Sequence, residues 1–123
     1  MGDRLRGHMS YYDILYENAF GNYRDMLEDV TLHIMMGYYL SHLQNKKGDP
    51  TLGTLPDENY AREIMQLFTI GLFELNMDGS YKRDASGDKI PTYDISDIQE
   101  LAKVFTGLSG GAWDLDRLSL IHI

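Results

Sequence analysis

Residues 56–71 constrain the fold more than any other stretch, because they carry the signals of a complete helix. Asp57 can accept hydrogen bonds from the free N–H groups of the first turn, and Gly71 can adopt the left-handed conformation that ends a helix. Apolar side chains recur at helical spacing on one face, at Tyr60, Ile64, Leu67 and Phe68. The stretch therefore predicts an amphipathic helix that buries this face.

The other face of this helix is polar and supplies the candidate functional residues. Its members are Asn59, Arg62, Glu63 and Gln66. Buried polar groups in helical packing often hydrogen-bond to one another, so a structural network is one interpretation. The other is a site in which Glu63 is the acid or base, Arg62 orients an anionic group, and Asn59 and Gln66 bind. Arg24 and Asp25, on a separate predicted helix, are further candidates for binding or for pairing with this face.

The N-terminal half adds more helices. Residues 1–9 are polar and contain glycine, so a disordered or non-native start is expected. Ser10 can cap a first helix that ends near Phe20. A second helix begins near Asn22 and either continues past His33 or bends there. Together with the central helix and one more, the pattern predicts a mainly α fold with four principal helices, which is a fragment of a larger helical domain.

After Gly71 the chain changes from a helical to an extended pattern. Turn signals predict a small β-hairpin insert over residues 72–91. Asp94 can cap the last helix together with Asp97. The predicted buried face of that helix consists of Ile95, Ile98, Leu101, Ala102 and Phe105. The helical domain fragment therefore covers residues 10–109, and residues 110–123 are expected to be a loose tail.

Composition narrows the classes of partner. The chain of 123 residues has a net charge of −8 and no basic stripe, which argues against nucleic acid as a partner. It has no cysteine, which excludes disulfides, thiolate catalysis and cysteine-ligated zinc. No apolar run approaches the length of a membrane span. His33 and His42 would point to opposite sides of a continuous helix, so no metal site and no cofactor are predicted.

Six short segments resemble one bacterial family, called domain of unknown function 1800. They lie in the family's order at residues 17–27, 30–33, 39–41, 59–63, 67–71 and 101–107, and include Glu-Asn-Ala-Phe-Gly-Asn-Tyr-Arg-Asp-Met-Leu and Leu-Phe-Thr-Ile-Gly. The resemblance implies a mainly helical protein several times longer than this chain. It also implies export or a place in the cell envelope, and a sulfatase-like exported protein as partner. It implies no established activity, cofactor or catalytic residue.

Two positions depart from the family's pattern. The family commonly has proline after the motif histidine, whereas Ile34 follows His33 here, so less bend is expected in this helix. Residues 118–123 do not continue the pattern and look like translated adaptor sequence. A partly non-native tail is therefore expected, with no function for His122.

Two functions remain open from the sequence. The first is a structural or interaction module of an exported protein, because no complete catalytic constellation is present and the helices are rich in tyrosine and methionine. The alternative is a hydrolase of glycans or esters that uses the polar face around Glu63. That alternative needs a cleft and a second carboxylate or histidine within reach.

Overall fold

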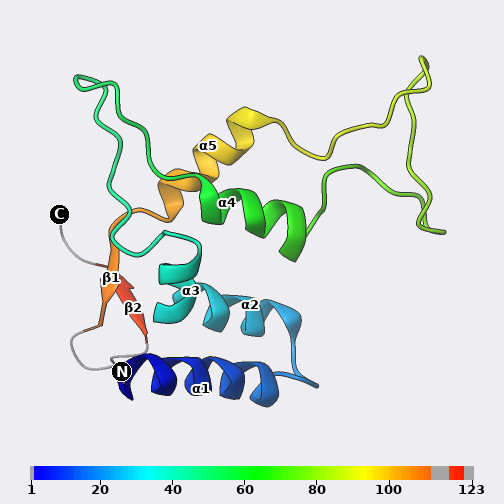
Figure 1. The fold of residues 1–123 in the computed structure, drawn as a ribbon. Coiled ribbons are helices and arrows are strands. Elements are labelled where there is room, and N and C mark those ends of the chain that lie inside the picture. The colour runs from blue at the N-terminus through cyan, green and yellow to red at the C-terminus, as the bar shows by residue number, and fades with distance from the viewer. Residues whose placement is uncertain (1, 112–116, 121–123) are drawn as a thin grey trace.

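The computed structural model describes residues 2–111 and 117–120, and the side chains of residues 5–111, 117 and 118. The fold is mainly α, as the sequence predicts. Its elements are α1 (Gly2–Glu17), α2 (Tyr23–Leu32), α3 (Ile34–Tyr39), α4 (Asn59–Glu63), the π-helical turn η1 (Ile64–Phe68), α5 (Ile95–Val104), β1 (Leu108–Gly110) and β2 (Leu118–Leu120). Figure 1 shows the helices in three tiers, with α2 and α3 between α1 and the α4–α5 pair.

The core lies where the middle tier meets α4 and α5. Its buried apolar members are Val30, Met36, Leu40, Tyr60, Ala61, Ile98, Ala102, Phe105, Leu108 and Leu118. Ala61 and Ala102 are 1% and 0% exposed. Because their side chains are small, α4 and α5 can approach each other closely.

Helix α1 begins at Gly2, whereas the sequence predicts a disordered stretch over residues 1–9 and a helix start at Ser10. Tertiary contact explains the difference. Gly7 is buried against Met35, and a Cβ atom on Gly7 would lie 2.7 Å from the Met35 sulfur. The Ser10 hydroxyl donates to the carbonyl of Gly7 at 3.1 Å, inside the helix, and caps nothing. A polar, glycine-containing start is thus held by its packing against α3.

The second predicted helix is divided at His33, which has extended dihedral angles (φ −76°, ψ 133°). The helix starts near Asn22 as predicted, and Asn22 caps α2 by accepting a hydrogen bond from the Arg24 N–H at 2.9 Å. The His33 Nδ1 caps α3 by accepting from the Met35 N–H at 3.1 Å. The bend is therefore present without a proline. Ile34 occupies the first position of α3, where the geometry would also suit proline.

The central predicted helix is present, but it changes type along its length. Asp57 accepts a hydrogen bond from the Asn59 N–H at 2.8 Å, and Gly71 has a positive φ of 74°, as expected. After Glu63 the chain enters the π-helical turn η1, which is wider than an α-helical turn and shifts the phase of the side chains. Tyr60, before this turn, is 1% exposed as predicted, whereas Leu67, inside the turn, is 67% exposed. The prediction that Leu67 shares the buried face is therefore wrong.

The segment between η1 and α5 protrudes from the helical body (Figure 1). It contains antiparallel bridges and two turns, at Gly79 and Gly87, where the turn signals predict them. The bridges pair Phe73 with Pro91, Leu75 with Tyr81 and Arg83 with Lys89. The Lys89 ammonium lies 3.8 Å from the Tyr81 ring centroid, a cation–π contact that joins two of these extended pieces.

Helix α5 starts with the predicted cap. Asp94 accepts from the N–H groups of Ser96 and Asp97, and the Asp97 carboxylate accepts from the Asp94 N–H at 2.9 Å. The hydrogen bonds from Ser96 hold the pKa of Asp94 below its usual value. Ile98 and Ala102 are buried as expected. Ile95 is 63% exposed, so its placement on the buried face is wrong; it lies in the first turn, one turn before the buried Ile98.

The expected loose tail contains regular structure. Strands β1 and β2 pair antiparallel, with Leu108 opposite Leu120, and Leu118 is 3% exposed in the core. Backbone hydrogen bonding and the burial of Leu118 together explain this correction. Residues 112–116 and 121–123, including His122, lie outside the described residues.

Candidate functional site

The predicted polar face on α4 and η1 makes few contacts with neighbouring helices. Arg62 pairs with Glu58, one turn earlier on the same segment, at 3.0 Å. The two side chains are 42% and 25% exposed, so water screens the pair and it contributes little stability. The Asn59 amide donates to the Ser41 hydroxyl at 3.4 Å, and Ser41 donates to Asp57. These contacts connect the face to the end of α3.

The other predicted site residues do not converge. Glu63 and Gln66 are half-buried and make no side-chain hydrogen bond or ion pair with the part of the chain that the structure describes. Arg24 and Asp25 are exposed on α2 and pair with neither Arg62 nor Glu63. None of these residues lines the groove or the clefts described below. A catalytic or binding role for them stays a prediction.

A polar cleft of about 310 Å³ lies beside α1, at the junction of α2 and α3. Its lining combines apolar side chains with polar ones: Ser10, Ile14, Glu17, Asp29, Leu32, His33 and Arg117. His33 is 3% exposed, and its Nε2 lies 3.1 Å from the Ser10 hydroxyl oxygen. The ring of Tyr11 meets the His33 ring edge-on, at 5.4 Å between centroids. A serine in hydrogen-bond contact with a histidine can act as a nucleophile if the histidine accepts the serine proton.

The hydrogen bonds around His33 argue against a serine nucleophile. Nδ1 accepts from the Met35 N–H, so a neutral ring carries its proton on Nε2. Nε2 then donates to Ser10, whose own proton goes to the Gly7 carbonyl. A general base needs an accepting nitrogen toward the hydroxyl that it activates. The arrangement therefore joins α1 to the α2–α3 junction and does not form a serine–histidine catalytic pair.

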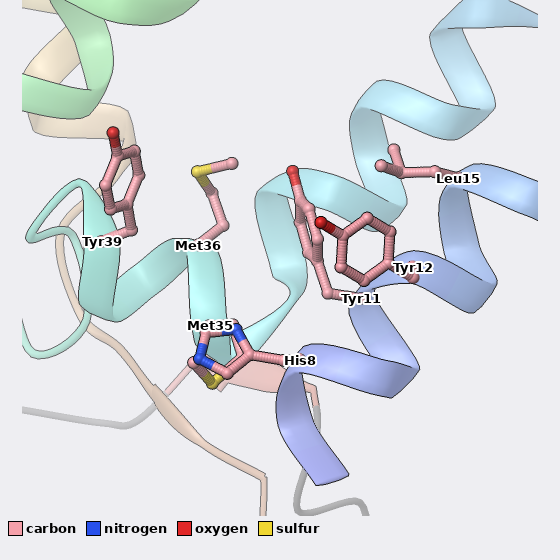
Figure 2. A pocket seen from close by; sticks show the side chains of 7 residues that line it. All are labelled: His8, Tyr11, Tyr12, Leu15, Met35, Met36 and Tyr39. Carbon is pink, nitrogen blue, oxygen red and sulfur yellow. The ribbon is translucent and has the colours of Figure 1, made fainter. Parts of the chain in front are cut away.

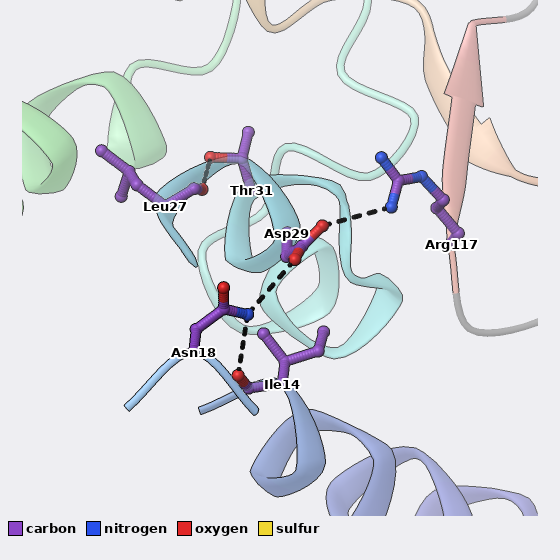
Figure 3. A network of polar contacts seen from close by, with 6 residues as sticks. All are labelled: Ile14, Asn18, Leu27, Asp29, Thr31 and Arg117. Atoms are coloured by element: carbon purple, nitrogen blue, oxygen red, sulfur yellow. Dashed lines mark hydrogen bonds and ion pairs between the residues drawn. The ribbon is translucent and has the colours of Figure 1, made fainter. Parts of the chain in front are cut away.

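Asp29 forms the centre of a polar network at the mouth of this cleft (Figure 3). The Asn18 amide donates to the Asp29 carboxylate at 3.3 Å and to the Ile14 carbonyl at 3.0 Å. Arg117 approaches the other carboxylate oxygen at 3.4 Å. Arg117 and Asp29 are 47% and 38% exposed, so the ion pair is screened by water. The network ties the end of α1, α2 and the start of β2 together.

An apolar groove of about 480 Å³ runs between α1 and α3 (Figure 2). It is lined by His8, Tyr11, Tyr12, Leu15, Met35, Met36 and Tyr39. A smaller cleft of about 140 Å³ shares Tyr11 and Leu15 with the groove and continues over α2 toward Phe68. Tyrosine and methionine side chains combine apolar area with adaptable shape, which suits contact with another protein.

A fourth hollow, of about 570 Å³, lies between residues 47–56 and the end of α5. Asn45 closes this loop: its amide donates to the Asp57 carbonyl at 3.1 Å and its oxygen accepts from the Asp57 N–H at 2.9 Å. Two lysines line the hollow, and one of them, Lys103, is paired with Glu100. The lining does not bring together an acid, a base and a nucleophile.

His42 is the most deeply buried polar side chain of the described residues, at 1% exposure. Its ring lies 4.0 Å from the Tyr60 ring centroid, and its Nε2 donates to the Thr31 carbonyl at 2.9 Å. Nδ1 has no hydrogen-bond partner among the residues that the structure describes. Burial lowers the pKa of His42 and outweighs the Thr31 hydrogen bond and the carboxylate of Asp57, which both raise it. The ring is therefore a neutral part of the core, with no accessible position for catalysis.

The sequence did not predict the polar cleft, its network of contacts or the apolar groove. The contact of Ser10 with His33 and that of Asp29 with Arg117 join residues far apart in the chain, and no local spacing signals them. The groove combines α1 and α3, which are separated in sequence by all of α2. The only available signal was the unusual number of tyrosines and methionines, nine and seven.

The described residues contain no group of three or more side chains placed to hold a metal ion. Within the same residues, no helix has the length and apolar character needed to cross a membrane.

No curated protein and no solved structure matches the chain. The family described as "Protein of unknown function (DUF1800)" matches residues 2–117, which is most of the chain. The chain therefore belongs to the DUF1800 family of proteins of unknown function.

Proposed function

We propose that this chain is a structural or interaction module of an exported bacterial protein. The observation that carries the proposal is the apolar groove between α1 and α3, whose walls expose large side chains to water. Tyr12 and Tyr39 are 71% and 79% exposed there. Burying such side chains against a partner is favourable, at about 25 cal/mol per Å² of apolar surface. The exported setting and the sulfatase-like partner come from the family resemblance.

The chemistry of the groove supports binding over catalysis. Its polar groups are the His8 imidazole and tyrosine hydroxyls, and no carboxylate or serine lines it. Interfaces are enriched in tyrosine and methionine, and aromatic side chains often dominate their binding energy. The groove lies between two helices and is lined by apolar and aromatic side chains, which suits an apolar helix or segment of another protein.

Tyr39→Ala is expected to weaken binding to the sulfatase-like exported protein by about tenfold or more, as truncation of an aromatic anchor commonly does. Isothermal titration calorimetry with the two purified proteins measures the change. Tyr38→Ala is the matched control, because Tyr38 is 67% exposed on the same helix but does not line the groove. Absence of binding by the unmodified chain, or equal binding by both variants, would contradict the proposal.

The alternative is a hydrolase of glycans or esters that uses Glu63. One observation favours it: Glu63 is half-buried and has no hydrogen-bond or ion-pair partner among the described side chains, whereas Arg62 pairs with Glu58. A partly buried carboxylate without a partner is available for proton transfer. Glu63→Gln is then expected to abolish hydrolysis of chromogenic glycoside and ester substrates while the circular dichroism spectrum is unchanged. Hydrolysis at the original rate by a folded Glu63→Gln protein would eliminate this role.

A further inference from the structure

The hollow between residues 47–56 and the end of α5 has the size of a small-molecule site, at about 570 Å³. It shares no residue with the apolar groove between α1 and α3. The apolar part of its lining consists of Pro50, Leu55 and Pro56. Ligand pockets commonly combine such a lining with a few polar groups that orient the ligand.

The loop that forms one wall of the hollow is held in one shape by its own contacts. Asn45 is 6% exposed and closes the neck of the loop through its two hydrogen bonds to the Asp57 backbone. Within the loop, the N–H groups of Asp49 and Thr54 each donate to the carbonyl of the other at 3.1 Å. A Cβ atom on Gly48 would lie 2.9 Å from the Thr54 carbonyl oxygen, so the loop is closely packed. A wall that is already formed loses little conformational entropy when a ligand binds.

The charges that line the hollow are positive. Its ionisable lining residues among those described are Lys47 and Lys103, and none carries a carboxylate, although the chain has 19 acidic and 11 basic residues. Lys103 pairs with Glu100, which does not line the hollow. The Lys47 ammonium has no ion-pair or hydrogen-bond partner in the described part of the chain. The hollow therefore complements an anionic group that is attached to an apolar body.

A hydroxyl group adds a second donor beside Lys47. The Thr54 hydroxyl oxygen accepts from the Asp49 N–H at 3.1 Å, and its own proton has no acceptor among the described residues. An ammonium and a hydroxyl can both donate to the oxygens of a carboxylate, and such charge-assisted hydrogen bonds are stronger than neutral ones.

We propose that the hollow binds a small amphipathic anion, a carboxylate that carries a hydrocarbon body. Lys47 and Thr54 hold the carboxylate, and Pro50, Leu55 and Pro56 cover the hydrocarbon. The inference goes beyond the proposed function, because it concerns a different surface and a different class of ligand. Failure of either proposal leaves the other to its own measurement.

NMR titration of the whole chain tests the site with three probes, octanoate, 1-octanol and acetate. Octanoate is expected to shift the amide signals of Gly48, Gly53 and Thr106, which line the hollow, until they saturate. 1-Octanol keeps the apolar body without the charge, and acetate keeps the charge with almost no body. Each should bind at least about tenfold more weakly than octanoate. Octanoate that leaves the three signals unmoved at about 10 mM overturns the proposal.

Lys47→Gln separates the charge from the apolar contact. It is expected to raise the dissociation constant of octanoate about tenfold and to leave that of 1-octanol unchanged, because only octanoate carries the charge. Lys46→Gln is the matched control, since Lys46 is exposed on the same loop but does not line the hollow. Equal losses from the two variants would show attraction to the general surface charge and would overturn the site.

Leu55→Asp tests the apolar contact. Leu55 and Leu52 are 69% and 75% exposed on the same loop, and only Leu55 lines the hollow. Leu55→Asp is expected to abolish octanoate binding, because it places a carboxylate against the ligand. Leu52→Asp, the matched control, should change the dissociation constant by less than about twofold. Octanoate binding that survives Leu55→Asp, in protein with an unchanged circular dichroism spectrum, overturns the proposal; if Leu55→Asp does not fold, Lys47→Gln decides.

Vesicles of anionic phospholipid distinguish a free ligand from a lipid surface. The chain is expected to bind octanoate in solution without sedimenting with such vesicles. Sedimentation with the vesicles, together with no binding of free octanoate, would assign the lysines to a membrane contact and overturn the proposal.

Discussion

Tyr60→Ala is expected to lower the free energy of unfolding by about 3–5 kcal/mol, the range for deletion of a buried aromatic ring. Tyr60 is 1% exposed and contacts the rings of His42 and Phe105, at 4.0 and 4.8 Å between centroids. Its removal leaves a cavity where α2, α3, α4 and α5 meet. Urea denaturation followed by circular dichroism measures the change.

Two further variants separate the ring from its hydroxyl. The Thr31 hydroxyl donates to the Leu27 carbonyl at 2.6 Å, so it accepts from the Tyr60 hydroxyl at 2.7 Å. Burial raises the pKa of Tyr60, which keeps this donor protonated. Tyr60→Phe should therefore cost only about 1 kcal/mol, the value of one hydrogen bond. Tyr38→Ala, on an exposed tyrosine, should change stability by less than about 0.5 kcal/mol. Equal losses from Tyr60→Ala and Tyr38→Ala would contradict the assigned core.

The burial of Tyr60 could be predicted from helical spacing, but the change of helix type after it could not. The same spacing placed Leu67 beside Tyr60, and the π-helical turn rotates Leu67 into water. A wide turn of this kind depends on how the segment meets its neighbours, for example the hydrogen bond from the Tyr23 hydroxyl to the Phe68 carbonyl. Such a contact between residues distant in sequence has no local signature.

Capping signals were the most dependable part of the sequence. Asp94 caps α5 as predicted, and Asp57 accepts a hydrogen bond from the first turn of α4 as predicted, because each contact depends only on residues two or three positions away. The start of α1 and the pairing of β1 with β2 depend instead on tertiary contacts, those of Gly7 and Leu118. Local composition therefore made both segments look less ordered than they are.

The candidate site also has one part that the local sequence predicts and another that depends on tertiary contacts. A polar face on one helix is visible in sequence, and it lies at the surface with few partners beyond its own segment. The groove needs α1 and α3 side by side, so it becomes visible only in three dimensions. The excess of tyrosine and methionine pointed to an interaction surface without placing it.

The stability of the fold is expected to fall as the pH is lowered below about 6.5, the ordinary pKa of histidine. Burial lowers the pKa of His42 in the folded state. The unfolded chain therefore takes up a proton first as the pH falls, and the free energy of unfolding decreases. Above that range His42 is neutral in both states and contributes no pH dependence. In the folded protein a protonated Nδ1 would have no acceptor in the described part of the chain, where this buried atom lacks a partner.

His42→Gln isolates this contribution, because glutamine does not titrate and can still donate to the Thr31 carbonyl. At pH 7.5 the variant should be less stable by about 1–3 kcal/mol, because it loses the stacking of the ring on Tyr60. Between pH 7.5 and 5 its stability should fall less than that of the unmodified chain. His8→Gln is the matched control, because His8 is exposed on α1. If His42→Gln does not fold, the His42 ring signals in an NMR titration of the unmodified chain test the same claim. Titration of His42 at or above the ordinary pKa, or identical pH profiles for the two proteins, would show that the buried neutral ring is wrongly assigned.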